Sequence, residues 1–174
     1  MSYGEVMLEE KILLHATLVF LMKPKKILMA KKARKIGAGL WNGYGGGINE
    51  GEDSRVAAVR ELEEESSLHT DPKDLEKVAL IDFYNTKTDG TKFICRVHVY
   101  FATIWSGGVK ETEEMLQPTW FYLDKLPLDE MMPADREWLP PLLAGKKIIA
   151  KAYYGPFQKE LLGVVEIKEV ASFD

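Results

Sequence analysis

The stretch from Gly46 to Leu68, GGINEGEDSRVAAVRELEEESSL, constrains this chain of 174 residues more than any other. Its second half predicts a helix, and residues at i, i+3 and i+4 share one helix face, which here carries Glu61, Glu64 and Glu65. Like charges at these spacings weaken an isolated helix by roughly 0.2–0.5 kcal/mol per pair. Clustered carboxylates suit Mg²⁺, which prefers oxygen ligands and keeps waters that a phosphate can replace. The pattern therefore indicates either a metal site or a solvated acidic helix face.

Glycine residues lead into this helix. Residues 45–47 are all glycine and permit backbone conformations that are closed to other residues. Gly51 predicts a further turn, and Asp53 or Ser54 is suited to cap the first turn of the helix. We therefore predict a glycine-rich loop, a turn and then the helix that carries the three carboxylates.

The spacing of the whole stretch resembles the Nudix box. Gly46 is followed after five residues by Glu52, and after seven more by Arg60 and the run RELEEESSL. The family usually has glycine at the position of Ser67, where it helps to end the helix. Serine is small, so we expect the metal site to stay intact. The resemblance implies an α/β protein with the Nudix fold, an α/β/α sandwich around a central mixed β-sheet.

Length and composition bound the rest of the interpretation. The length predicts a single domain, which the resemblance implies is a Nudix hydrolase domain over residues 1–174. The composition, with 46% hydrophobic and 29% charged residues, is typical of a soluble globular protein. A net charge of −4 argues against general nucleic-acid binding. The single cysteine, Cys95, cannot form an internal disulfide, which agrees with a reducing compartment. We therefore expect a cytoplasmic monomer that acts on a small molecule and has no nucleic-acid partner.

The longest apolar run covers residues 12–22 and is too short to span a bilayer. Acidic residues precede it, namely Glu5, Glu9 and Glu10, whereas a signal peptide begins with basic residues. We therefore expect neither a targeting segment nor a membrane partner.

Short apolar runs between turn residues predict the remaining elements. Residues 12–22 are expected to form a strand buried on both faces, and residues 27–30 a second strand after a turn. Further along we expect a hairpin of residues 77–86 and 93–104, a helix over residues 135–143 and a terminal hairpin around residues 153–156. One mixed sheet packed between helices would bury these elements.

Three loop features each admit two interpretations. The basic residues from Lys31 to Lys35 form either a solvated loop or an electropositive lip that attracts an anionic substrate. Asn42 is either a turn residue or a reader of a base edge, because an amide both donates and accepts hydrogen bonds. The acidic loop with Glu111 and Glu114 is either solvated or, as the Nudix resemblance implies, the source of another metal ligand or of a base.

The resemblance extends beyond the box. Among Nudix hydrolases the chain is most similar to the oxidised-purine nucleoside triphosphatases, the 8-oxo-dGTP diphosphatases of the MutT-homologue type. The matching features are Thr17, residues 37–43, residues 118–121 and residues 132–138. The resemblance implies Mg²⁺-dependent hydrolysis of oxidised purine triphosphates such as 8-oxo-dGTP to the monophosphate and pyrophosphate, with Mn²⁺ as a substitute cation.

The resemblance also implies roles for individual residues. The predicted metal ligands are Gly46, Glu61, Glu64, Glu65 and Glu111. The predicted catalytic residues are Glu65, Glu61, Glu64, Glu52 and Arg60, and the proton acceptor is Glu65, Glu52 or a glutamate of residues 111–114. The predicted substrate contacts are Thr17, Lys32, Asn42, Met132 and Asp135.

Two positions at the expected base pocket depart from the family pattern. Met132 replaces an aromatic residue that stacks on the base, and Ala134 replaces the first of two adjacent aspartates. A lost hydrogen-bonding group can change discrimination by a few kcal/mol if its partner is left unpaired. Each remaining contact also has a structural interpretation: Thr17 as an ordinary strand residue, Asp135 as a helix cap and Met132 as core.

Three other functions compete with this interpretation. One is a Nudix pyrophosphatase for another nucleoside diphosphate derivative, such as an unoxidised triphosphate, a dinucleoside polyphosphate or a nucleotide sugar. Another is a non-catalytic nucleotide-binding Nudix domain, although a sensor has no need to keep every acidic position of the box. The last is an interaction domain with an acidic helix.

Overall fold

A computed structural model describes residues 12–173 of the chain. Glu5, Glu9 and Glu10, on which the expectation about a signal peptide rests, lie outside the described residues. The elements in chain order are β1 (Ile12–Lys23), β2 (Lys26–Lys32), β3 (Trp41–Asn42), β4 (Tyr44–Gly47), α2 (Ser54–Ser66), η1 (Pro72–Asp74), β5 (Glu76–Thr86), β6 (Lys92–Ala102), β7 (Met115–Tyr122), η2 (Leu128–Glu130), α3 (Asp135–Leu143), β8 (Lys147–Pro156) and β9 (Glu166–Val170).

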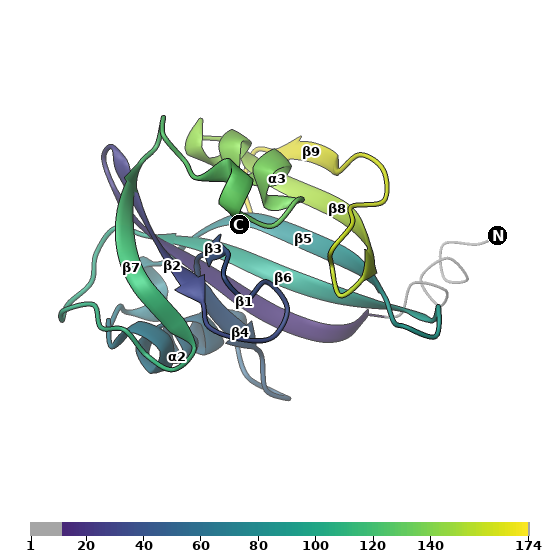
Figure 1. Cartoon of the computed structure of the whole chain (residues 1–174). Coiled ribbons are helices and arrows are strands. Elements are labelled where there is room, and N and C mark those ends of the chain that lie inside the picture. The colour runs from purple at the N-terminus through teal and green to yellow at the C-terminus, as the bar shows by residue number, and fades with distance from the viewer. Residues whose placement is uncertain (1–11, 174) are drawn as a thin grey trace.

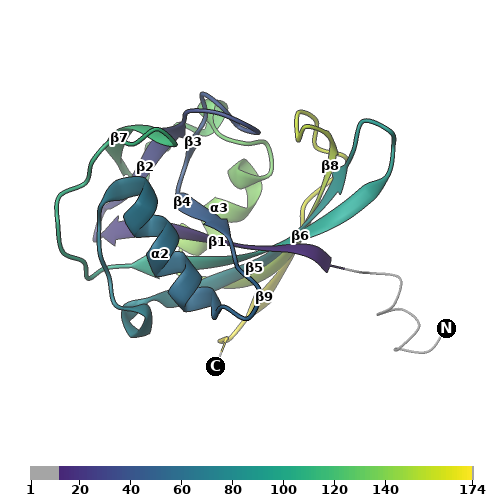
Figure 2. The same cartoon turned by 90° about the horizontal axis from the view of Figure 1, so that it is seen from below.

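The strands form one mixed sheet in the order β3-β2-β1-β6-β5-β8-β9, with β4 paired to β1 and β7 paired to β2. The pairs β1–β6 and β5–β8 are parallel, whereas β5–β6, β1–β4 and β8–β9 are antiparallel. Helices α2 and α3 lie on opposite sides of the sheet (Figures 1 and 2). The predicted α/β/α sandwich with a central mixed sheet is confirmed.

Successive side chains of β1 point to opposite faces of the sheet, where two separate hydrophobic cores lie. Val19 and Leu21 are buried in the core beneath α2, while Phe20 between them is buried in the core that contains α3. Burial on both faces is therefore confirmed for the second half of the strand. It is wrong for the first half, where the side chain of Leu14 is 52% exposed and His15 is exposed. Figure 2 shows this end of β1 extending beyond α2 and α3, so neither of these helices covers it.

Helix α2 begins and ends as its sequence suggests. The side chain of Asp53 accepts hydrogen bonds from the backbone N–H groups of Arg55 and Val56, so Asp53 rather than Ser54 is the cap. Ser67 ends the helix in the left-handed conformation, with φ of 67°, and its N–H donates to the carbonyl of Glu63. Glycine favours this conformation. Serine accepts it here without changing the end of the helix.

The two predicted hairpins are also present. Strands β5 and β6 pair in antiparallel fashion, and Gly90, with φ of 88°, lies in the turn between them. Strands β8 and β9 form the terminal hairpin, but residues 153–156 continue β8 instead of making its turn. The loop begins at Phe157 and Gln158, which both have positive φ. None of the described helices is long and apolar enough to cross a membrane.

Candidate active site

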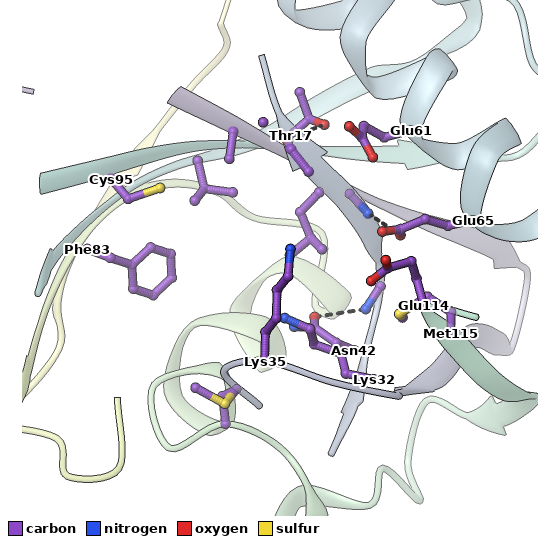
Figure 3. A pocket seen from close by; sticks show the side chains of 18 of the residues that line it. Thr17, Lys32, Lys35, Asn42, Glu61, Glu65, Phe83, Cys95, Glu114 and Met115 are labelled. Carbon is purple, nitrogen blue, oxygen red and sulfur yellow. Dashed lines mark hydrogen bonds between the residues drawn. The ribbon is translucent and has the colours of Figure 1, made fainter. Parts of the chain in front are cut away.

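A cleft of about 530 Å³ opens where β1, β4 and α2 meet the loops that precede β7 and α3. It gathers side chains from segments that are far apart in the sequence (Figure 3). Nine of the predicted site residues line this cleft: Thr17, Lys32, Asn42, Gly46, Glu61, Glu64, Glu65, Met132 and Asp135. Glu52, Arg60 and Glu111, which were also predicted, do not line it.

The predicted glycine-rich loop at residues 45–47 is wrong: these glycines belong to strand β4, and close packing requires the first two. A Cβ atom on Gly45 would lie 1.9 Å from the carbonyl oxygen of Thr17, and one on Gly46 would lie 2.5 Å from the carboxylate of Glu61. No side chain fits at either position. Strand β4 can therefore pass between β1 and α2, with Gly46 opposite Thr17 in the sheet. This places the Gly46 backbone directly beside the Glu61 carboxylate.

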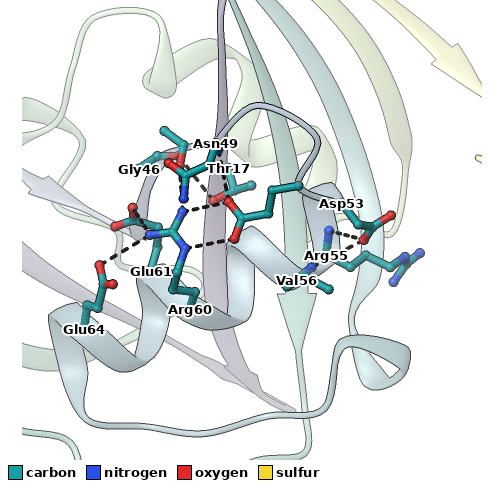
Figure 4. Close-up of polar contacts among 11 residues, drawn as sticks. Thr17, Gly46, Asn49, Asp53, Arg55, Val56, Arg60, Glu61 and Glu64 are labelled. Atoms are coloured by element: carbon teal, nitrogen blue, oxygen red, sulfur yellow. Dashed lines mark hydrogen bonds and ion pairs between the residues drawn. The ribbon is translucent and has the colours of Figure 1, made fainter.

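Arg60 organises the polar side of α2 (Figure 4). Its Nε and Nη2 atoms donate to the two carboxylate oxygens of Glu52, each at 2.9 Å, and Nη2 also donates to the Gly47 carbonyl at 3.0 Å. Its Nη1 atom donates to Glu61 Oε1 at 2.9 Å and lies 3.5 Å from Glu64 Oε2. The paired guanidinium lowers the pKa of Glu52 to about 2. Such a carboxylate is a weak proton acceptor, so Glu52 and Arg60 orient the site.

Glu65 lies deeper in the cleft than the other two carboxylates of α2. Its Oε2 atom accepts a hydrogen bond from the Gly45 N–H at 3.1 Å. Burial raises the pKa of Glu65 to about 7, the Gly45 N–H opposes that change, and the nearby charges of Glu61 and Glu114 add to it. Figure 3 shows the carboxylates of Glu65 and Glu114 facing each other. With this pKa, the Glu65 carboxyl group is present in both its charged and its protonated form at neutral pH.

The donor set fits a hard divalent cation. The carboxylates of Glu61, Glu64 and Glu65 and the backbone of Gly46 all border the cleft. Within residues 12–173, no three acidic, histidine or cysteine side chains are arranged so that they could hold a metal ion by themselves. Mg²⁺ does not require such an arrangement, because it binds through one or two carboxylates together with water and phosphate oxygens. The residues present therefore match an open site that a phosphate substrate completes.

The two glutamates of the loop before β7 are placed differently. Glu114 lines the cleft and pairs with Arg34, whose Nε donates to Glu114 Oε1 at 3.0 Å; this contact lowers the pKa of Glu114. Glu111 is exposed, and its carboxylate accepts a hydrogen bond from the Gln117 N–H at 2.8 Å. The Thr112 hydroxyl donates to the Glu65 carbonyl at 3.0 Å and so ties this loop to α2.

The other end of the cleft is buried. Asp135 is 4% exposed, and its Oδ1 atom accepts a hydrogen bond from Trp138 Nε1 at 2.9 Å. Burial raises the pKa of Asp135 to about 7, against smaller opposing effects of Trp138 and Lys32. Ala134, not Asp135, occupies the cap position of α3, and no side chain caps that helix. The interpretation of Asp135 as a helix cap is therefore wrong.

Asn42 and Met132 border the same buried end. The Oδ1 atom of Asn42 accepts the Gly43 N–H at 2.8 Å, which leaves its NH₂ group as the available donor. Met132 is 7% exposed and belongs to the core next to α3 while it also lines the cleft. Its sulfur lies so close to Gly37 that a Cβ atom there would be 3.2 Å away. Met132 therefore serves both as core and as one wall of the cleft.

The basic loop contributes to the cleft selectively. Lys32 lines it, and burial lowers the pKa of Lys32 while Glu65 and Glu114 oppose that effect. Lys31 instead places its ammonium group 5.1 Å from the ring centre of Trp41. Lys35 and Arg34, which pairs with Glu114, also line the cleft, so three of the four basic residues from Lys31 to Lys35 border it.

Sequence reasoning missed Tyr154 as a site residue. It lines the cleft from β8, and its hydroxyl oxygen accepts the Ala134 N–H at 2.8 Å. Its position depends on the parallel pairing of β8 with β5, for which the local sequence carries no signal. Trp138 also lines the cleft. The sequence indicates weakly that it is a site residue, because it follows Asp135 by three residues and so shares its helix face.

Comparisons with known proteins agree with this geometry. Residues 13–142 match the family described as NUDIX domain. The chain is 42% identical to an oxidized purine nucleoside triphosphate hydrolase from Mus musculus over 131 residues, which cover 75% of this chain and 80% of that protein. It is 38% identical to a protein of the same name from Danio rerio over 133 residues, which cover 76% and 81%.

A solved structure of a MutT protein from Bacillus halodurans has the same fold. It aligns with a TM-score of 0.75 at 20% sequence identity, over 90% of this chain and 98% of that one. The family match spans most of the chain, including strand β4 and helix α2, and both of these elements border the cleft. This chain belongs to the NUDIX domain family.

Proposed function

We propose that this protein is a hydrolase that converts oxidised purine nucleoside triphosphates, such as 8-oxo-dGTP, to the monophosphate and pyrophosphate. One observation carries the proposal: a single cleft joins the carboxylates of α2 to a buried carboxyl, amide and aromatic pocket. The first end suits a metal-bound triphosphate and the second suits a purine. The two relatives named for oxidised purine triphosphates, which the chain covers over about four-fifths of their length, support the same substrate class.

NUDIX enzymes use divalent cations, and we assign Mg²⁺ to this site with Mn²⁺ as a substitute. Glu61, Glu64 and the Gly46 carbonyl are the groups that would hold it. When bound, the cation neutralises charge that develops on the phosphate oxygens in the transition state. Glu114 replaces Glu111 in the proposal as the loop glutamate of the site, because Glu114 borders the cleft and Glu111 does not.

Glu65 is the proton acceptor in this proposal. A general base works best when its pKa lies near the operating pH, and the pKa of Glu65 is about 7. Its Oε2 atom is held by the Gly45 N–H, so Oε1 is the atom that takes the proton of the attacking water. Glu52 is unsuited to this role because Arg60 lowers its pKa to about 2.

The buried end holds the base. Asn42 offers an NH₂ donor, Asp135 offers a carboxyl group, and Met132 covers one face of the ring. Lys32 supplies positive charge toward the phosphates. A net charge of −4 argues against a nucleic-acid partner. We also propose that the protein is a cytoplasmic monomer that acts on free nucleotides and has no membrane partner.

A nucleotide panel tests the proposal. The purified protein is incubated with Mg²⁺ and with oxidised purine, normal purine and pyrimidine triphosphates, a dinucleoside polyphosphate and a nucleotide sugar. We expect the highest kcat/KM for oxidised purine triphosphates, with one pyrophosphate released per monophosphate formed. Release of orthophosphate instead, or a higher kcat/KM for a dinucleoside polyphosphate or a nucleotide sugar, would contradict the proposal.

A further inference from the structure

Tyr154 is held rigidly at the base end of the cleft. Its side chain is 1% exposed, and its ring stacks on Phe83, with ring centres 6.1 Å apart and planes 14° apart. Its hydroxyl oxygen accepts the Ala134 N–H at 2.8 Å. Both ends of the side chain are therefore fixed, and Tyr154 and Phe83 line the cleft together with Asp135.

The hydroxyl group still has a hydrogen to donate. A phenol both accepts and donates, and the Ala134 N–H occupies its oxygen as an acceptor. Among the described residues, no acceptor receives the hydroxyl hydrogen. Burial and the nearby carboxyl of Asp135 raise the pKa of Tyr154, so the group keeps its proton at any working pH. A buried donor without an acceptor is unfavourable, and a ligand that supplies an acceptor gains by satisfying it.

Asp135 is the neighbouring group with complementary capacity. Within the described chain only its Oδ1 atom is engaged, by Trp138. The residue before it, Ala134, has no side-chain hydrogen-bonding group, so the buried pair that meets a base from this side is Tyr154 and Asp135. An ionised carboxylate can only accept, whereas the tyrosine hydroxyl supplies the donor.

We propose that the hydroxyl of Tyr154 donates a hydrogen bond to the 6-oxo group of the purine while Asp135 accepts from the adjacent ring N–H, so that the site selects 6-oxopurines over 6-aminopurines. This inference rests on the proposed function and names its substrate class more narrowly. A 6-oxopurine presents an acceptor at position 6, whereas a 6-aminopurine presents a donor there. A 6-amino group would meet the hydroxyl hydrogen donor to donor and leave both unpaired.

The test compares three triphosphates that differ at position 6: deoxyinosine (6-oxo, which also carries a hydrogen on the adjacent ring nitrogen), deoxyadenosine (6-amino) and unsubstituted purine deoxyriboside (6-H). For the wild type we expect kcat/KM for the 6-oxo substrate to exceed both others by about 10-fold or more, the worth of one buried hydrogen bond. In Tyr154→Phe we expect this ratio to fall by about 10-fold, because the 6-oxo substrate loses its partner at position 6 but keeps the contact of its ring N–H with Asp135.

Tyr153→Phe is the matched control. Tyr153 is the adjacent residue of β8, and its hydroxyl donates to Glu166 at the surface, away from the cleft. This variant should keep the wild-type ratio. Thermal unfolding of both variants checks that Tyr154→Phe is folded, and a merely structural role of Tyr154 would lower kcat/KM equally for all three substrates.

Two outcomes overturn the inference. One is a wild-type ratio near one, which decides the matter even if Tyr154→Phe does not fold. The other is a wild-type ratio that survives in folded Tyr154→Phe, which would assign the 6-oxo group to another donor such as Asn42. Failure of the proposed function looks different, because the wild type would then hydrolyse none of the purine triphosphates to monophosphate and pyrophosphate.

Discussion

The carboxylates of α2 and the polar groups at the base end of the cleft differ in how they meet solvent. The side chain of Glu64 is 58% exposed and shares Arg60 with Glu61, whereas Asp135 and Tyr154 are 4% and 1% exposed. In the proposed function, the exposed carboxylates act through a cation and through the phosphates that every nucleotide has. Buried hydrogen-bonding groups penalise a poorly matched partner, so they distinguish one base from another.

This difference assigns rate to one end and selectivity to the other. A change at the carboxylates should slow the hydrolysis of all nucleotides by a similar factor. A change at Asp135 or Tyr154 should affect purines and leave other bases nearly as they were. The two ends can therefore be separated by substitutions, each measured on more than one substrate.

The largest effect is expected from Glu64→Gln. This substitution keeps the shape of the side chain and removes a charge that would hold the cation, and metal stabilisation is worth several kcal/mol. We expect kcat to fall on the order of 10²–10⁴-fold on every nucleotide, with the protein still folded. Glu63→Gln on the same helix is the control, because Glu63 points to His69 and away from the cleft. Full activity of Glu64→Gln would contradict the proposed role of this carboxylate in holding the cation.

A smaller, selective effect is expected from Asp135→Ala. Losing one or two buried hydrogen bonds should lower kcat/KM for purine triphosphates by roughly 10- to 100-fold. Asn42→Ala should act in the same direction, and the double variant should lose less than the product of the two, because both residues hold one base. Independent, fully multiplicative losses would mean that the two side chains do not share a ligand.

Lys32→Met should raise KM by about 10-fold with little change in kcat, since a half-buried cation near the phosphates contributes about one charge-assisted hydrogen bond. Lys31→Met is the matched control, because Lys31 stacks on Trp41 outside the cleft. Added salt should reduce the difference between Lys32→Met and wild type. Equal KM values for the two variants at low salt would show that the basic loop is only solvated.

The last effect is on stability rather than on activity, and it depends on pH. The pKa of Asp135 is raised from 3.8 to about 7 in the folded state, so the folded protein binds this proton more tightly than the unfolded chain. The free energy of unfolding should therefore fall as pH rises from about 4 to about 7 and then level off, relative to Asp135→Asn. Thermal unfolding of both proteins across this range measures the difference. A difference that does not change with pH would show that Asp135 is not buried as described.

The carboxylates of α2 were predicted well because these residues lie close together in the sequence. The spacing of Glu61, Glu64 and Glu65 alone places them on one helix face. The glycines at residues 45–47 were expected to form a loop, whereas they belong to strand β4. The sequence left Asp53 and Ser54 open as the cap of α2. It also selected Glu111 as the metal ligand of the loop before β7, whereas Glu114 lines the cleft.

The base end was predicted less completely because it is assembled from distant segments. Asn42, Met132 and Asp135 were found through resemblance to a family. Tyr154 was not, since its place is set by the register of β8 on β5, where Tyr84 lies opposite Tyr153. Long-range strand pairing of this kind leaves no periodic trace in the local sequence. The residue that we propose as a determinant of base selection therefore became visible only in three dimensions.

The ratio of kcat/KM for an oxidised purine triphosphate to that for a pyrimidine triphosphate tests the central claim most directly, when it is measured in wild type, Glu64→Gln and Asp135→Ala. The division of the cleft predicts that Glu64→Gln lowers both values and keeps the wild-type ratio, whereas Asp135→Ala lowers the ratio by roughly 10- to 100-fold. An unchanged ratio in Asp135→Ala, or a ratio that falls as far in Glu64→Gln, would contradict the claim that one end supplies rate and the other selects the base.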